Sequence, residues 1–223
     1  MSPVVTRSLL AGAGTTLEIV AAASLLAAAI SLLIAQCRLS RYVVVRFPAT
    51  VFLEFFRGTS ALVQLFWAYY VLPLLGVQLP AFEVGFLVLG MNAGAYGSEI
   101  VRGAMLAIPK GQLEASKVLS LSPTTTLRYV TLPQALRIIL PPAESLLIDV
   151  LKASALVSLI TVNDFTGSIN GWASQGTIGL TPAYSIMIFG YLLMSAPLSG
   201  GMRLLARRAN RHLRPARIEA GAR

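Results

Sequence analysis

The chain has 223 residues, of which 56% are hydrophobic and only 12% are charged. A soluble domain of this size could not hide so much apolar surface, so the composition excludes an ordinary soluble protein and predicts an all-α polytopic membrane protein. The single cysteine, Cys37, excludes an intrachain disulfide and a metal site built from several cysteines. The formal net charge is +9. The basic C-terminal tail has no interleaved aromatic residues for base stacking, so nucleic-acid binding is not expected.

Five apolar stretches can cross a bilayer, which takes about 20 residues. In chain order they cover residues 17–36, 59–76, 82–101, 136–160 and 184–205. Another apolar stretch, at 42–56, is interrupted by Arg46, Pro48 and Glu54. We expect it to be an interfacial helix or the buried beginning of the second span rather than a separate crossing. Residues 1–10 lack a cationic region followed by a cleavage site, so the first span is expected to remain in the mature protein.

The placement of the positive charges predicts the orientation. Of the 18 Lys and Arg residues, four lie at 38–57, five at 102–137 and seven at 203–223, whereas the connection at 161–182 carries none. Because cytoplasmic connections carry the excess of positive charge, we expect an external N-terminus, five spans and a cytoplasmic C-terminus. The four glycines within 161–182 predict that this outer connection forms a regular helix poorly. It is either a solvated connector or a docking surface for an external binding protein.

The stretch 103–132 is a polar connection between two spans, long enough to have a role of its own. Pro109 can open a short helix that runs from Lys110 to Leu121. Ser122, followed by proline, is a signal for a new helix, because serine caps free amides and proline is tolerated in the first turn. The second helix is expected to run to about residue 130, before Pro133 turns the chain into the next span.

The first of these helices has an apolar face that needs a partner. Ala115, Val118 and Leu119 share one side by helical spacing. Glu114 lies in the first turn, where the helix dipole favours a carboxylate and where it can also meet an arginine of a partner. Two helices this short cannot build a core, so we expect them to dock on another protein.

These residues resemble the EAA loop, by which permeases of ATP-binding-cassette (ABC) importers contact their ATPase. Glu114 and Ala115 match the family pattern, and Leu132-Pro133 match in register. Ser116 replaces an alanine and Val130 an isoleucine. Ser120 replaces the glycine that ends the first helix, so the bend is expected to rest on Ser122-Pro123.

Further stretches resemble the polar-amino-acid (histidine, glutamine, arginine, opine) subfamily of these permeases. They are Phe56-Arg57-Gly58-Thr59, Ala95-Tyr96-Gly97-Ser98-Glu99, Ile108-Pro109-Lys110-Gly111-Gln112 and Leu132-Pro133-Gln134-Ala135. The sequence from Arg57 to Trp67 looks most like that of the branch that takes up ectoine and hydroxyectoine.

The resemblance implies a single permease domain over residues 1–223, with the coupling loop at 103–132, in the inner membrane of a bacterium. The residues it assigns to ATPase coupling are Gly111, Gln112, Glu114, Ala115, Ser116, Leu119, Ser120, Leu132 and Pro133. The implied partners are ATPase subunits, a second permease subunit as homo- or heterodimer, an external solute-binding protein and membrane lipid. The chain has no phosphate-cradling glycine-lysine motif and needs no cofactor of its own, so ATP and Mg²⁺ are expected on the ATPase.

Polar groups inside the spans mark a candidate solute path, because such groups are costly in lipid. Asp149 and Lys152 can pair at i, i+3, and Glu144 shares a face with Lys152. These three either meet a zwitterionic solute or form a structural ion pair between subunits. The subfamily differs from this chain at Glu144 and Ala153. Gln64 in the second span is a further candidate.

Asn92 and Tyr96 form a polar stripe in the third span with Glu99, whose expected role is an ion pair with Arg102. Two other functions compete with the ABC interpretation. A secondary transporter or channel subunit would not be driven by ATP, but a secondary transporter usually has repeated halves. An intramembrane enzyme would use Glu144 and Asp149 as an acid pair.

Overall fold

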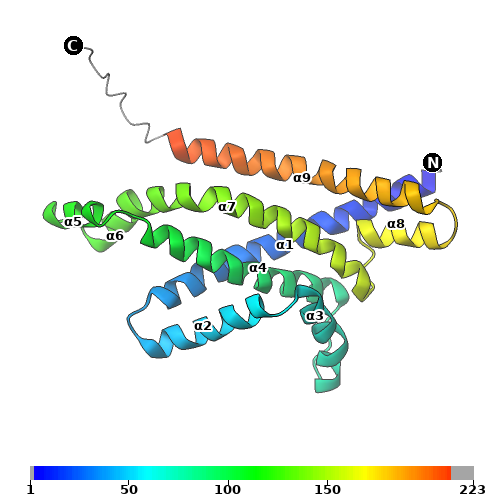
Figure 1. The fold of residues 1–223 in the computed structure, drawn as a ribbon, viewed down its shortest axis with the longest axis horizontal. Coiled ribbons are helices and arrows are strands. Elements are labelled where there is room, and N and C mark those ends of the chain that lie inside the picture. Colours follow the sequence, from blue (N-terminus) through cyan, green and yellow to red (C-terminus); the bar gives the residue numbers. More distant parts are fainter. Residues whose placement is uncertain (1–2, 212–223) are drawn as a thin grey trace, which may run out of the picture.

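The computed structural model describes residues 3–211, which form helices joined by short connections (Figure 1). The first half of the chain contains α1 (Pro3–Leu39), α2 (Val43–Gly58), α3 (Ala61–Phe66), a π turn η1 (Trp67–Val71), a 3₁₀ turn η2 (Leu72–Leu75) and α4 (Ala81–Leu106). The second half contains α5 (Lys110–Val118), α6 (Pro123–Thr126), a π turn η3 (Leu127–Thr131), α7 (Leu132–Ala153), a 3₁₀ turn η4 (Ser154–Ile160), α8 (Phe165–Ser174) and α9 (Leu180–Arg211). The all-α membrane fold predicted from composition is therefore confirmed.

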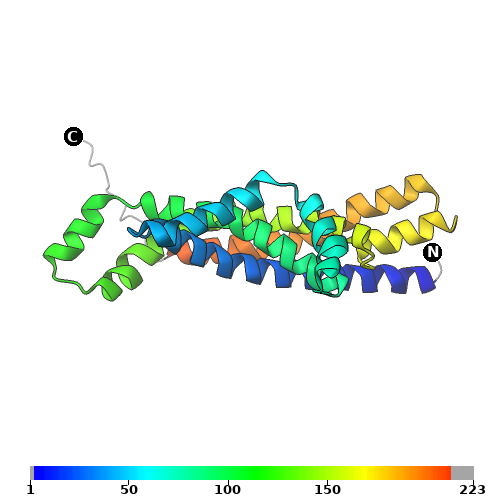
Figure 2. The ribbon, with the colours of Figure 1, turned by 90° about the horizontal axis from the view of Figure 1, so that it is seen from below.

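Three of the described helices are long and apolar enough to cross a membrane alone: α1, α4 and α9. Two bent pairs bring the number to five if each pair is one span. In one pair α2 is followed by Ala61–Leu75, and in the other Pro123–Ile160 is followed by α8. Figures 1 and 2 show α5 and α6 at one end of the molecule, and α8 beside the N-terminus at the other.

The close packing of α1 on α4 rests on small residues. Gly90, Gly94 and Gly97 of α4 face α1, and a Cβ atom added at Gly94 would lie 2.7 Å from Ile30 Cβ. Ser31 of α1 donates its hydroxyl either to Ala27 O of its own helix at 2.6 Å or to Gly94 O of α4 at 3.2 Å. Without side chains at the glycines, the two backbones approach closely, as in other helix pairs within membranes.

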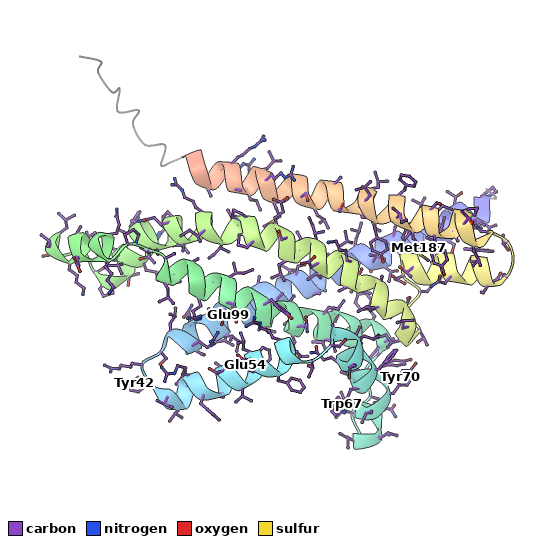
Figure 3. The ribbon with its side chains drawn as sticks, viewed as in Figure 1. Tyr42, Glu54, Trp67, Tyr70, Glu99 and Met187 are labelled. Atoms are coloured by element: carbon purple, nitrogen blue, oxygen red, sulfur yellow. The ribbon has the colours of Figure 1, made fainter. Side chains whose placement is uncertain are left out.

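The second predicted span, at 59–76, is not a single crossing helix. The helical stretch Ala61–Leu75 leaves α2 at an angle of 103°. With a rise of about 1.5 Å per residue it is too short for a hydrocarbon core of about 30 Å. Instead α2 lies against α1 and α4, with Ala49 and Leu53 buried. If the bent pair is one span, the stretch at 42–56 begins it. Trp67 and Tyr70 lie on the arm that leaves the bundle (Figure 3).

The connection at 161–182 contains a regular helix, so the prediction from its glycine content is wrong. The Asp164 carboxylate caps α8 by accepting a hydrogen bond from Gly167 N at 2.8 Å. Phe165 and Ile169, four residues apart, are buried against the rest of the bundle. The two glycines of α8 cost about 1 kcal/mol each, whereas the cap contributes about 1 kcal/mol and the burial of each of these two apolar side chains about 1.5–3 kcal/mol, so the helix forms.

Candidate coupling loop and translocation path

The first helix of the loop, α5, ends three residues earlier than predicted, and its end depends on Ser120. Ser120 adopts the left-handed conformation, with φ 55°. Its amide donates to Lys117 O at 2.9 Å, and the amide of Leu121 donates to Ser116 O at 3.0 Å. These two bonds are the Schellman pattern that usually ends on glycine. The bend therefore begins at Ser120 itself, which corrects the expectation that it rests on Ser122-Pro123.

The restart signal at Ser122 is present, whereas the expected turn at Pro133 is not. Thr125 N donates to the Ser122 hydroxyl at 3.2 Å, as predicted for a cap. From α6 the chain continues through η3 directly into α7, with Pro133 in the first turn of α7. The π turn shifts the backbone bonding, with Leu132 N donating to Leu127 O, and a proline without an amide is tolerated in a first turn. The second coupling helix is thus the beginning of the α7 span.

Most of the residues predicted for ATPase coupling lie on the surface of this end. Val118 and Leu119 have 84% and 71% of their surface exposed, and Glu114 and Ala115 are exposed beside them. Gly111, Gln112, Ser120 and Leu132 are also exposed, and Pro133 is half-buried. Ser116 is the exception, because it is buried and donates its hydroxyl to Leu113 O at 2.8 Å. It therefore stabilises α5 itself and does not form part of the exposed surface.

Two of the predicted path residues hold the bend after α2. Asn92 Nδ2 donates to Phe56 O at 2.9 Å and to Gln64 Oε1 at 3.2 Å. Gln64 Nε2 donates to Phe56 O at 3.2 Å and to the Thr59 hydroxyl at 2.7 Å. Helix ends leave carbonyl groups without partners, and these two amides satisfy such a carbonyl. The sequence contained no sign of this role, because Phe56 and Asn92 are 36 residues apart.

Three predicted path residues line one cavity between α4 and α7. Asn92, Tyr96 and Asp149 contribute to its wall, and its volume is about 270 Å³. The Arg57 guanidinium lies over the Tyr96 ring, 5.5 Å from the centroid. Lys152 donates to Asp149 Oδ1 at 3.2 Å, so the predicted i, i+3 pair forms, and both side chains are about two-thirds exposed.

Glu144 is separated from this group. Its carboxylate accepts a hydrogen bond from Arg203 Nε of α9 at 3.1 Å, so neither the pairing with Lys152 nor an acid pair with Asp149 describes its surroundings. Arg203 was missed as a partner because only the packing of α9 on α7 brings these residues together. Glu99 forms ion pairs with Arg102 at 2.9 Å, as expected, and also with Arg38 of α1.

Comparison with known proteins decides the family. The family described as "Binding-protein-dependent transport system inner membrane component" matches residues 27–211. The chain belongs to this family. It is 38% identical over 178 residues to a probable amino-acid ABC transporter permease, y4tF of Sinorhizobium fredii, covering 75% of this chain and 73% of the relative. It is also 38% identical over 151 residues to the probable amino-acid ABC transporter permease YckA of Bacillus subtilis, covering 68% and 67%.

A solved structure agrees with this assignment. The chain superposes with a TM-score of 0.82 and 32% identity on the crystal structure of an amino acid ABC transporter with histidines, covering 91% of this chain and 94% of that one. This permease is thus a multi-pass inner-membrane component of an ABC importer of the amino-acid permease type. The ATPase is a separate subunit, a binding protein is the other implied partner, and permease subunits of this kind carry no cofactor.

Proposed function

We propose that this permease forms, with a second permease subunit, the translocation path for a polar amino acid or an amino-acid-like solute. The family and the amino-acid permeases among its relatives support a solute of this class. The narrower proposal, based on the wording of residues 57–67, is a compatible solute of the ectoine type. Uptake of labelled histidine, glutamine and ectoine by the reconstituted transporter would separate these solutes.

The observation that carries the proposal is the uncovered face of α5. Val118 and Leu119 are exposed beside Glu114 at one end of the molecule, where no lipid tail could cover them if the loop is cytoplasmic. We propose that residues 103–132 of the single domain 1–223 dock in a groove of the ATPase. Movement of the ATPases would then reach α7 directly, because α6 and η3 continue into it.

The same end of the molecule supports the proposed orientation. The C-terminal part of α9 points towards the end that contains α5 and α6, and the N-terminus lies at the opposite end (Figure 2). Arg38 and Arg203 lie towards the C-terminal ends of α1 and α9, which are the ends that we propose to face the cytoplasm. The last basic residues, 212–223, lie outside the described residues. An anionic inner leaflet would attract this charge, so lipid is included among the partners.

The proposed path runs beside the cavity between α4 and α7. Asn92, Tyr96 and Asp149 offer an amide, a hydroxyl and a carboxylate to a polar solute. The exposed pair of Asp149 and Lys152 would be costly against lipid, so we place the second subunit and the solute on this side. In this proposal Gln64 does not line the cavity but orients Asn92, which does. Glu144 has a structural role, since it binds Arg203 of α9.

The coupling proposal is tested by removing the charge and adding bulk at α5. Glu114→Ala and Ala115→Trp should each lower solute-stimulated ATP hydrolysis at least about tenfold, because a lost charge-assisted contact costs about 1.5–3 kcal/mol and overpacking costs a similar amount. The matched controls are Glu54→Ala on α2 and Ala11→Trp on α1, both at exposed positions outside residues 103–132. They should retain most of the stimulation.

A second measurement tests contact rather than activity. Cysteine in place of the exposed Leu119 should cross-link to the ATPase in a background without Cys37. Full transport by both the Glu114 and the Ala115 variants in a reconstituted complex would show that the loop is a simple connector, and the coupling proposal would then be abandoned.

A further inference from the structure

A carboxyl group with no part in coupling or in the path is enclosed where η4 meets α8. Asp164 has 0% of its surface exposed. Its Oδ1 atom accepts the bond from Gly167 N that caps α8, but Oδ2 has no hydrogen-bond partner in the part of the chain that the structure describes. A buried charged oxygen without a partner is strongly destabilising, whereas a neutral acid at the same position is not.

The surroundings of Asp164 join α8 to two other helices. The amide of Phe165, the next residue, donates to the Thr16 hydroxyl of α1 at 3.0 Å. Thr166 shares a hydrogen bond of 2.9 Å with the Tyr191 hydroxyl of α9. The backbone of α1 approaches so closely that a Cβ at Gly12 would lie 2.7 Å from Asp164 O. The start of α8 is thus clamped between α1 and α9, with the carboxyl at its centre.

No neighbouring charge compensates this carboxyl. From α1, Gly12 lies beside the Asp164 backbone and Thr16 accepts the bond from the next amide, and from α9 the Tyr191 hydroxyl acts on the carboxyl. Within the described residues, Tyr191 is the one ionisable side chain that acts on Asp164, and it is neutral at ordinary pH. Its hydroxyl and the amides of Gly167 and Thr166 partly favour the carboxylate, but burial outweighs them. Asp164 lies at the break between η4 and α8, where its carboxyl is fully enclosed, and such surroundings favour the neutral acid over the carboxylate.

We propose that Asp164 is a proton-binding site that latches α8 onto α1 and α9. The neutral acid occupies the enclosed position, and loss of the proton favours release of the helix. The side of the membrane that supplies the proton follows from the orientation proposed above, but the latch itself does not depend on it.

The direction of the pH dependence follows from linkage. The docked state binds the proton more tightly than the released state, in which an aspartate has a pKa of about 3.9. Docking is therefore strongest at low pH and is lost as the pH rises towards the pKa of the docked carboxyl. Between the pKa of the released aspartate and that of the docked carboxyl, each pH unit increases the released fraction by up to about tenfold.

The test compares two adjacent cysteines on α8 in the assembled transporter, reconstituted in nanodiscs, with Cys37 replaced by serine. Ile169 is fully buried against the bundle and Asn170 is exposed. Ile169→Cys should react with a charged thiosulfonate reagent only when α8 is released. Asn170→Cys measures the intrinsic pH dependence of thiol labelling, so the ratio of the two rates isolates docking.

The ratio should rise several-fold between about pH 5 and about pH 8, within the range above the ordinary aspartate pKa. Asp164→Asn keeps the cap acceptor but cannot ionise, so the ratio should stay low and flat. Asp164→Ser is a second neutral cap in case the asparagine variant does not assemble. A flat ratio in the protein with Asp164 would overturn the proposal, as would the same rise in a neutral variant. Neither solute nor ATP is needed, so a failure here is distinct from a failure of the transport proposal.

Discussion

Replacing Gly97 by alanine should loosen the pairing of α1 and α4. The added Cβ would overlap the Ser31 hydroxyl, and it would also lie 3.1 Å from Ser31 Cβ and 3.3 Å from Leu146 Cδ2 of α7. Ser31 cannot simply turn away, because its hydroxyl bonds to Ala27 O or Gly94 O. The new methyl group therefore forces either the loss of this bond or a shift of two packed helices.

The expected cost is about 1–3 kcal/mol, the usual range for overpacking a well-packed position. The higher helix propensity of alanine offsets part of this cost, because glycine within a helix is less favourable than alanine by about 1 kcal/mol. The matched control is Gly103→Ala in the last turns of the same helix, where an added Cβ meets nothing within 4 Å. That variant should be neutral or stabilised by up to about 1 kcal/mol.

The free energy of unfolding, measured by denaturant titration in mild detergent micelles, compares the two variants directly. A third variant, Gly97→Ala with Ser31→Ala, removes the overlapping hydroxyl and leaves a closest approach of 3.1 Å to the Cβ at position 31. It should recover much of the loss, with a coupling energy of about 1 kcal/mol between the two sites. Equal stability of the Gly97 and Gly103 variants would refute the assigned packing.

Three further changes test the loop, the ion pair and the orientation. Ser120→Gly should protect the end of α5 against hydrogen exchange, because a left-handed serine stores about 1 kcal/mol or more of strain; unchanged exchange would contradict this. Lys152→Ala should lower the yield of assembled transporter in size-exclusion chromatography, since breaking a pair buried by the second subunit costs about 3–5 kcal/mol. Adding Asp149→Ala should restore that yield, and transport lost despite normal assembly would assign the pair to the solute path. Reporter fusions should be external at Thr177 and cytoplasmic after Arg223; a cytoplasmic result at Thr177 would contradict the five-span orientation.

Local signals were sufficient for much of the coupling loop. Ser122 caps a helix as predicted, because a cap depends on residues within one turn of it. The end of α5 was predicted less well, since the sequence does not show that Ser120 adopts the left-handed conformation that the pattern reserves for glycine. At Pro133 the local rule failed because the preceding π turn had already changed the backbone bonding.

The sequence by itself determined the class of this protein and located the long apolar helices α1, α4 and α9 that can cross a membrane. Insertion into lipid depends on the residue types along about 20 positions, and orientation depends on the basic residues beside them. Only the tertiary structure decided how the helices are bent and paired. The bend after α2 is held by Asn92, Glu144 is bound to Arg203, and α8 is a helix clamped on α1 and α9. Each of these depends on contacts between residues far apart in the chain, whose geometry no local pattern contains.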